Sequence, residues 1–389
     1  MAAGNEEVKR GGGLGPMTAT VQASQSAEQS ERPTEKIVLP GQTPQGEHIL
    51  SVLVKRTYDI LPGQCKRAAT DKKLVPGDLH YADPMNSTVK FESDLIPFKL
   101  ATDVVLNGNA YAPSRQPVTN LTVSLSIGPY RKDLLIIGDR VCRHKNGADP
   151  VFTDPKPFQT MELRFERAYG GVDIYSEPKL PCAYPRNHLG RGYAVKNTQR
   201  SIENLPLPNI EDPNNHLTPQ RLCAGDFRNW ENQPLPQGLG WTMKLWHPRC
   251  TYAGIMPADR ALEEELRKAY SPLVPPAQRK FYEQNPLPTV DFRFFNGASP
   301  GLVVPFLSGT EQVTLTNLNP EGTLQFRLPG ERPFISVDIG QGTQEPEVVL
   351  HTVMIRSEDR QVDLLWRGAI PYPGRDWLPE MKKMELVIQ

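Results

Sequence analysis

The chain has 389 residues, and its 44 lysines and arginines balance 44 aspartates and glutamates, so the formal net charge is zero. A neutral chain lacks the surplus of Lys and Arg that nucleic-acid binding requires, so we expect no nucleic-acid partner. No apolar run approaches the roughly 18 residues that span a bilayer, and the N-terminal segment has no signal-peptide core. We therefore expect no membrane contact and a cytoplasmic location.

The five cysteines are scattered and include no CxxC pair. An odd, scattered set does not make a disulfide framework, so a reducing compartment is the simpler interpretation. The 39 prolines and 30 glycines interrupt the chain often. This punctuation favours many short strands joined by turns over long helices.

Residues 1–46 are polar, rich in Gly, Ser and Gln, and without an apolar period, which predicts a disordered N-terminal tail. Strand formers dominate from residue 50 to residue 58. Apolar and polar residues alternate strictly over 121–127, as in a half-buried antiparallel strand. Further strands are predicted at 103–111, 134–138, 161–168, 290–295, 312–317, 324–328, 348–355 and 362–367.

The segment 169–257 is dense in Pro, Asn, Gly and aromatic residues and shows little periodicity. A loop of this length is unusual in a compact domain unless it is functional, so we predict an irregular insert packed over the sheets. An apolar stripe at helical spacing predicts one helix over 258–270. We expect strands within 331–389 to pack on the same domain as 47–330.

These elements together predict a mainly β fold with antiparallel sheets. The sheets are expected to pack as a sandwich or a barrel-like core that carries the irregular insert and one or two short helices.

The best match to an enzyme motif is Gly297-Ala-Ser-Pro-Gly301, which fits the G-x-S-x-G nucleophile elbow. The oxyanion hole of an elbow uses the backbone N–H of the residue after the serine, and Pro300 has none. We therefore predict a Pro-Gly turn here rather than a catalytic Ser299.

Two pairs of carboxylates could serve as general acid and base in glycoside hydrolysis. Glu92 and Asp94 lie two residues apart, and Glu162 and Glu166 share one face of the predicted strand. Ion pairing with neighbouring lysines and arginines is the alternative. A carbohydrate-binding module or a glycoside-acting enzyme therefore stays open as a second interpretation.

The seven histidines do not cluster as metal ligands do. His247 and Cys250 could share a site with a distant third ligand, but an ordinary histidine and a buried cysteine are the simpler interpretation. No Gly-rich phosphate-binding motif is present. We therefore expect neither a metal nor a cofactor.

Arg140, Arg167, Arg191 and Arg249 each lie beside glycines or aromatic residues. Arginine suits bidentate pairing with carboxylates inside folds and at interfaces. These four residues therefore predict either internal Arg–Glu ties or contacts with a partner.

Short motifs of this kind follow one another between Lys55 and Pro329. Examples are Lys55-Arg-Thr-Tyr-Asp59, Phe165-Glu-Arg-Ala-Tyr-Gly-Gly171 and Trp246-His-Pro-Arg249. The ordered set resembles the domain-of-unknown-function family 2169. The candidate structural or partner-contact residues in it are Glu92, Asp94, Asp103, Arg140, Glu166, Arg167, Gly170, Gly171, Asn187, Gly190, Arg191, Gly192, Asn209, Glu211, Trp246 and Arg249.

The resemblance implies a cytoplasmic adaptor, or chaperone, of bacterial type VI secretion. Such an adaptor is expected to couple a toxic effector, often one with a PAAR domain, to the VgrG spike. The resemblance implies a non-catalytic protein whose partners are such an effector and VgrG. Its oligomeric state stays open, and so does a role as a structural piece of the spike.

The chain departs from the family pattern at Cys142 and at His188, where other members have an aromatic residue and a proline. Because its length is expected to vary, the segment 258–270 is a candidate for partner-specific contact. A surface helix that closes the core is the alternative.

Overall fold

The structure is a computed structural model. It describes residues 34–144, 148–176, 179–196, 198–223, 227–254, 290–340, 342–372 and 384–389. The fold is mainly β, as predicted, and nearly all strand pairs are antiparallel. The exceptions are β23 with β6 and β13 with β16, which are parallel. Among the described residues, no helix is long and apolar enough to cross a membrane.

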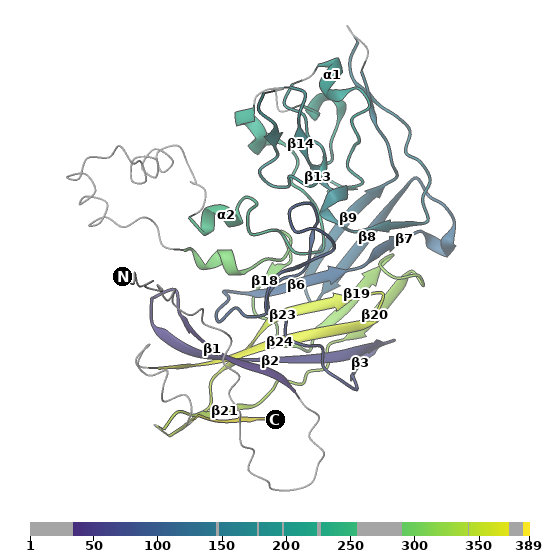
Figure 1. Cartoon of the computed structure of the whole chain (residues 1–389). Coiled ribbons are helices and arrows are strands. Elements are labelled where there is room, and N and C mark those ends of the chain that lie inside the picture. Colours follow the sequence, from purple (N-terminus) through teal and green to yellow (C-terminus); the bar gives the residue numbers. More distant parts are fainter. Residues whose placement is uncertain are drawn as a thin grey trace, which may run out of the picture.

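The main sheet combines strands from both ends of the chain (Figure 1). Its order is β1 (Glu35–Gln42), β2 (His48–Leu61), β24 (Gln361–Pro371), β23 (Val348–Arg356), β6 (Thr102–Asn107) and β18 (Val303–Val304), and β3 (Gln64–Arg67) also pairs with β2. β23 and β24 come from the predicted C-terminal region, yet they lie in the middle of this sheet. The C-terminal region is therefore integral to the main sheet.

A second sheet shares one hydrophobic core with the main sheet. Its order is β17 (Ile210–Glu211), β9 (Tyr130–Ile137), β8 (Asn120–Ile127), β19 (Gln312–Thr316) and β20 (Thr323–Arg327). β8 shows the alternation predicted for 121–127, since Leu121, Val123, Leu125 and Ile127 are all buried in this core. The two sheets therefore bury their apolar faces together.

Smaller elements complete the described part of the chain. One three-stranded sheet contains β22 (Thr343–Gln344), β21 (Ile335–Asp338) and β25 (Glu385–Ile388). Two-stranded sheets pair β4 (Leu79–His80) with β5 (Val89–Phe91), β7 (Asn109–Tyr111) with β12 (Thr160–Glu162), β10 (Cys142–Arg143) with β11 (Val151–Phe152), β13 (Tyr169–Gly170) with β16 (Arg191–Gly192), and β14 (Val172–Asp173) with β15 (Cys182–Ala183). The helices are α1 (Gln199–Ile202) and α2 (Arg249–Tyr252), and the 3-10 helices are η1 (Pro113–Arg115), η2 (Phe165–Arg167), η3 (Pro219–Arg221), η4 (Phe227–Asn232) and η5 (Phe292–Phe295).

The described part of 169–257 contains only short elements joined by irregular backbone. In Figure 1, α1, β13 and β14 gather beyond β8 and β9, at the end of the molecule opposite the main sheet. A second hydrophobic cluster, which includes Tyr169, Tyr184 and Tyr193, gives this region its own core. The helix predicted over 258–270 lies outside the described residues.

Three sequence predictions are wrong in part. The predicted disordered tail 1–46 contains β1, an edge strand, and Pro40 is tolerated there because an edge strand has one unpaired side. The predicted strand 161–168 ends at Glu162, and η2 follows. The predicted strand 290–295 contains η5 instead, because the Asp291 side chain accepts a hydrogen bond from the Arg293 N–H and caps a helical turn.

Candidate functional site

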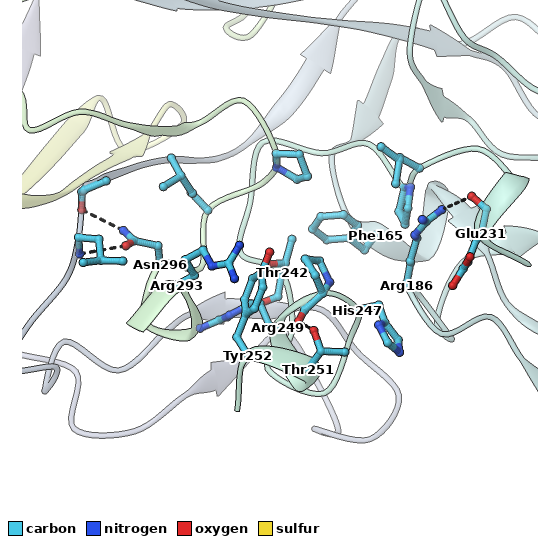
Figure 2. A pocket seen from close by; sticks show the side chains of 18 of the residues that line it. Phe165, Arg186, Glu231, Thr242, His247, Arg249, Thr251, Tyr252, Arg293 and Asn296 are labelled. Carbon is cyan, nitrogen blue, oxygen red and sulfur yellow. Dashed lines mark hydrogen bonds between the residues drawn. The ribbon is translucent and has the colours of Figure 1, made fainter. Parts of the chain in front are cut away.

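A groove of about 700 Å³ opens where five separate parts of the chain meet. Figure 2 shows Phe165, Arg186 and Glu231 on one side of it and Asn296 and Arg293 on the other. Residues of this groove come from 100–101, 165, 186, 230–252 and 293–303. The site is therefore a product of the tertiary fold rather than of one motif.

The wall of the groove is largely apolar and partly open to solvent. Leu100 and Leu235 are each 44% exposed, and Val303 is 39% exposed. Phe165 and Trp230 add aromatic surface to the same wall. Large apolar side chains that are exposed together in a concave surface are typical of a binding site for a protein or an apolar ligand.

Two arginines lie at the edge of the groove, and each stacks on an aromatic ring. Arg186 lies 5.0 Å from the ring of Trp230 and donates a hydrogen bond of 3.0 Å to the carbonyl oxygen of Glu231. Arg293 lies 4.3 Å from the ring of Tyr252. Stacking holds such long side chains in place, and Arg293 is also held by an ion pair with Asp291 at 2.5 Å.

His247 lies against Trp230, with the ring centroids 4.9 Å apart. Burial, reinforced by the charge of Arg186, lowers the pKa of His247. Among the described residues, no cluster of His, Cys, Asp and Glu could hold a metal ion. His247 and Cys250, which the sequence left open as two ligands of a metal site, thus have no third ligand within that part of the chain.

The floor of the groove is held by a buried ion pair between Arg249 and Glu92. The Nη2 of Arg249 lies 2.6 Å from one carboxylate oxygen of Glu92, and its Nη1 lies 3.2 Å from the other. A Cβ on Gly297 would lie 2.0 Å from the Glu92 carboxylate, so a larger residue there would displace this ion pair. Removing one partner of such a pair typically costs about 3–5 kcal/mol, because a buried charge is left uncompensated.

Trp246 anchors the groove from the other side. Its ring packs edge-on against Phe165 at 5.1 Å, and its Nε1 donates a hydrogen bond of 3.0 Å to Nδ1 of His188. His188 stands where other family members have a proline. Its ring nitrogen accepts this hydrogen bond, and a proline ring has no acceptor to do so. Trp246 and Arg249 bracket the cis peptide bond between His247 and Pro248.

A second group of predicted residues forms a tie at the base of the insert. The Asn187 side chain donates hydrogen bonds of 2.8 and 3.1 Å to the carbonyl oxygens of Phe165 and Tyr169. Gly170 has a φ of 147°, and a Cβ there would lie 2.1 Å from the Asn187 carbonyl oxygen. Close backbone approach likewise requires Gly171 and Gly190, and Gly192 has a φ of 93° and lies against the Pro208 ring.

The remaining arginines of the motifs fasten this tie to the end of β9. Arg140 pairs with Glu211, which is buried. Desolvation raises the pKa of Glu211, and Arg140 opposes that change. Arg167 donates to Asn209 at 3.2 Å, and Arg191 donates to the carbonyl oxygen of Glu166 at 3.0 Å. These three contacts join segments that are distant in sequence.

Asp94 and Asp103 are also held by cations. Asp94 pairs with Lys55 at 2.7 Å, and Asp103 pairs with Lys99 at 2.6 Å. Of the two interpretations of the arginine-rich motifs, the geometry favours internal ties. The candidate residues named from the motifs therefore build the frame around the groove, and among these candidates only Arg249 lines it.

The structure does not bring the predicted carboxylate pairs together as acid and base. Glu92 and Asp94 pair with different cations, Arg249 and Lys55. Glu166 accepts a hydrogen bond from the Thr88 N–H at 2.8 Å. Glu162 instead lines a separate polar hollow of about 300 Å³.

Ser299 is fully buried, and its hydroxyl donates a hydrogen bond of 2.8 Å to the carbonyl oxygen of Gly240. The Leu302 N–H donates to the Ser299 carbonyl oxygen at 2.9 Å, and Gly301 has a φ of 85°. This geometry is the Pro-Gly turn that the sequence predicted.

Sequence reasoning missed the exposed apolar residues of the groove, Leu100, Leu235 and Val303. Each stands among prolines or beside a strand without a periodic pattern, so no local signal distinguishes it from a core residue. Only the tertiary fold brings the three into one wall.

One family model covers all the motifs that form this frame. A family model described as "Uncharacterized protein conserved in bacteria (DUF2169)" matches residues 45–367. The chain belongs to this bacterial family. The DUF2169 match includes β23 and most of β24, and so extends beyond the motif string that ends at Pro329. No curated protein and no solved structure matches the chain.

Proposed function

We propose that this protein is a non-catalytic adaptor, or chaperone, that binds a type VI secretion effector in the cytoplasm and helps to load it onto the VgrG/PAAR spike. The motif string between Lys55 and Pro329 supports the proposal, because it resembles adaptors of that kind. The observation that carries it is the groove, where Leu100, Leu235 and Val303 are exposed together.

The frame around the groove suits a docking surface. Arg249, Glu92 and Trp246 hold the floor through buried contacts. Preformed walls lower the ordering cost that binding must overcome. An extended or helical effector segment with large apolar side chains would bury the exposed aliphatic residues, each worth up to about 2 kcal/mol if fully covered.

Substitution of Val303 by Asp tests this surface. Val303 and Val151 both lie in two-residue strands and are 39% and 58% exposed, but only Val303 lines the groove. Val303→Asp is expected to weaken binding of the effector encoded beside this gene at least tenfold, because a carboxylate would be buried against apolar groups. The matched control Val151→Asp should retain the affinity, as measured by calorimetry with purified proteins.

Deletion of the gene tests the role in secretion. Without the adaptor, the effector should be degraded or retained in the cell, while effectors that use other adaptors are secreted normally. Unchanged abundance and secretion of the neighbouring effector would contradict the proposal.

One observation favours a second candidate function, carbohydrate binding. The polar hollow that contains Glu162 is also lined by Tyr81 and Phe91, and aromatic rings beside carboxylates suit sugars. However, the guanidinium of Arg164 lies 4.1 Å from the Tyr81 ring and covers part of it. Binding of an oligosaccharide in a glycan array, lost in Glu162→Gln, would favour this alternative over the adaptor.

A further inference from the structure

One face of the main sheet, beneath the segment 68–101, carries several buried charges. Three cations on or against this face each pair with a carboxylate. The pairs are Lys55–Asp94 at 2.7 Å, Lys99–Asp103 at 2.6 Å and Arg356–Asp363 at 3.1 Å. Such pairing is expected, since an isolated buried charge is costly.

Arg367 of β24 breaks this pattern. It shares the face with Asp363 and Leu365 because residues two apart in a strand point the same way. Arg367 is only 8% exposed, yet among the described residues no carboxylate lies within 4.0 Å of it and no acceptor receives a hydrogen bond from it. Its Nε has neither a partner nor contact with solvent. Burial lowers the pKa of Arg367 to about 10, with Glu347 opposing the change.

His351, in the neighbouring strand β23, is a second polar side chain without a partner. It is fully buried at a β-bulge, and neither ring nitrogen has a hydrogen-bond partner among the described residues. Its ring stacks at 6.4 Å on Phe306, which is 40% exposed. Arg367 and His351 are therefore two nearby polar side chains with nitrogen atoms that have no hydrogen-bond partner among the described residues.

Arg367 is connected to the groove through aromatic residues. Its guanidinium lies 4.7 Å from the ring of Phe98, which packs edge-on against Phe292 at 5.6 Å. Phe292 begins η5, and Arg293 in that helix lines the groove. Leu100, two residues after Phe98, lines it as well.

We propose that Arg367, which lies beside the groove, binds a carboxylate side chain of the protein partner, an Asp or Glu in the effector next to the segment that occupies the groove. This inference rests on the proposed function. Guanidinium pairs with carboxylate in a bidentate geometry, and a site that excludes water strengthens the interaction. The partner would supply a carboxylate to Arg367, whereas Lys55, Lys99 and Arg356 pair with carboxylates of this chain.

The free chain gives the first test, with Arg356→Met as the matched control for Arg367→Met. Arg356 is also 8% exposed and lies in the adjacent strand, but it pairs with Asp363. Arg356→Met is expected to lower the unfolding temperature, because Asp363 would lose its partner. Arg367→Met should leave the unfolding temperature unchanged or raise it. An equal loss in both variants would show that a carboxylate of the chain itself pairs with Arg367, and would overturn the inference.

Binding to the neighbouring effector gives the second test. Arg367→Met should weaken the complex at least tenfold, while Arg367→Lys should retain part of the affinity because it keeps the charge. Unchanged affinity in Arg367→Met, with Val303→Asp still impaired, would overturn the role of Arg367 and leave the adaptor function standing. Failure of the unmodified chain to bind the effector would instead contradict the proposed function itself.

Discussion

His351 is a fully buried histidine whose pKa is held well below its ordinary value, first by burial and then by the charges of Arg367 and Lys99. The folded protein therefore does not bind a proton at this ring under mildly acidic conditions. The unfolded chain does so below about pH 6.5, the ordinary histidine pKa. Folding stability must therefore fall as the pH falls through this range.

The predicted consequence is a loss of about 1.4 kcal/mol per pH unit from His351 once the pH is below about 6. His351→Phe should remove this part of the acid slope, because phenylalanine binds no proton in either state. His216→Phe, at an exposed position, should keep the slope. Denaturant unfolding between pH 7 and pH 5 measures it, and an identical slope in His351→Phe and the unmodified chain would refute the prediction.

At the scale of elements, strict alternation was the most reliable signal. The alternation over 121–127 predicted β8, because a strand with one buried face needs that period. Aromatic content alone misled at 290–295, where the cap formed by Asp291 favours η5. β1 was not predicted because Pro40 and Gly41 are residues that usually interrupt strands. An edge strand tolerates both.

β1 provides a testable prediction at this scale. It covers one edge of β2 through a register that runs from Glu35–Lys55 to Gln42–His48. Deletion of residues 1–46 should lower the unfolding temperature and promote association relative to deletion of residues 1–33, because the edge of β2 becomes free to pair. Thermal unfolding and size-exclusion chromatography of the two truncated chains measure the difference. Identical behaviour would show that β1 adds no stability.

At the scale of the whole molecule, the sequence predicted the frame of the site better than the site. Motif residues such as Asn187 and Arg249 stood out because tight backbone turns and buried ion pairs demand particular side chains. Leu100, Val303 and Arg367 did not stand out. Their exposure or lack of a partner depends on contacts between segments hundreds of residues apart, which no local pattern records.

We propose that the groove is the surface on which this protein binds an effector. Hydrogen–deuterium exchange of the full chain, alone and in complex with the neighbouring effector, tests it most directly. We expect slower exchange on binding at 98–101, 235–252 and 292–304, with no change in the strand pairs β10–β11 and β14–β15, which lie outside the groove. Protection confined to those strand pairs, or to the polar hollow around Glu162, with the groove unchanged, would contradict it.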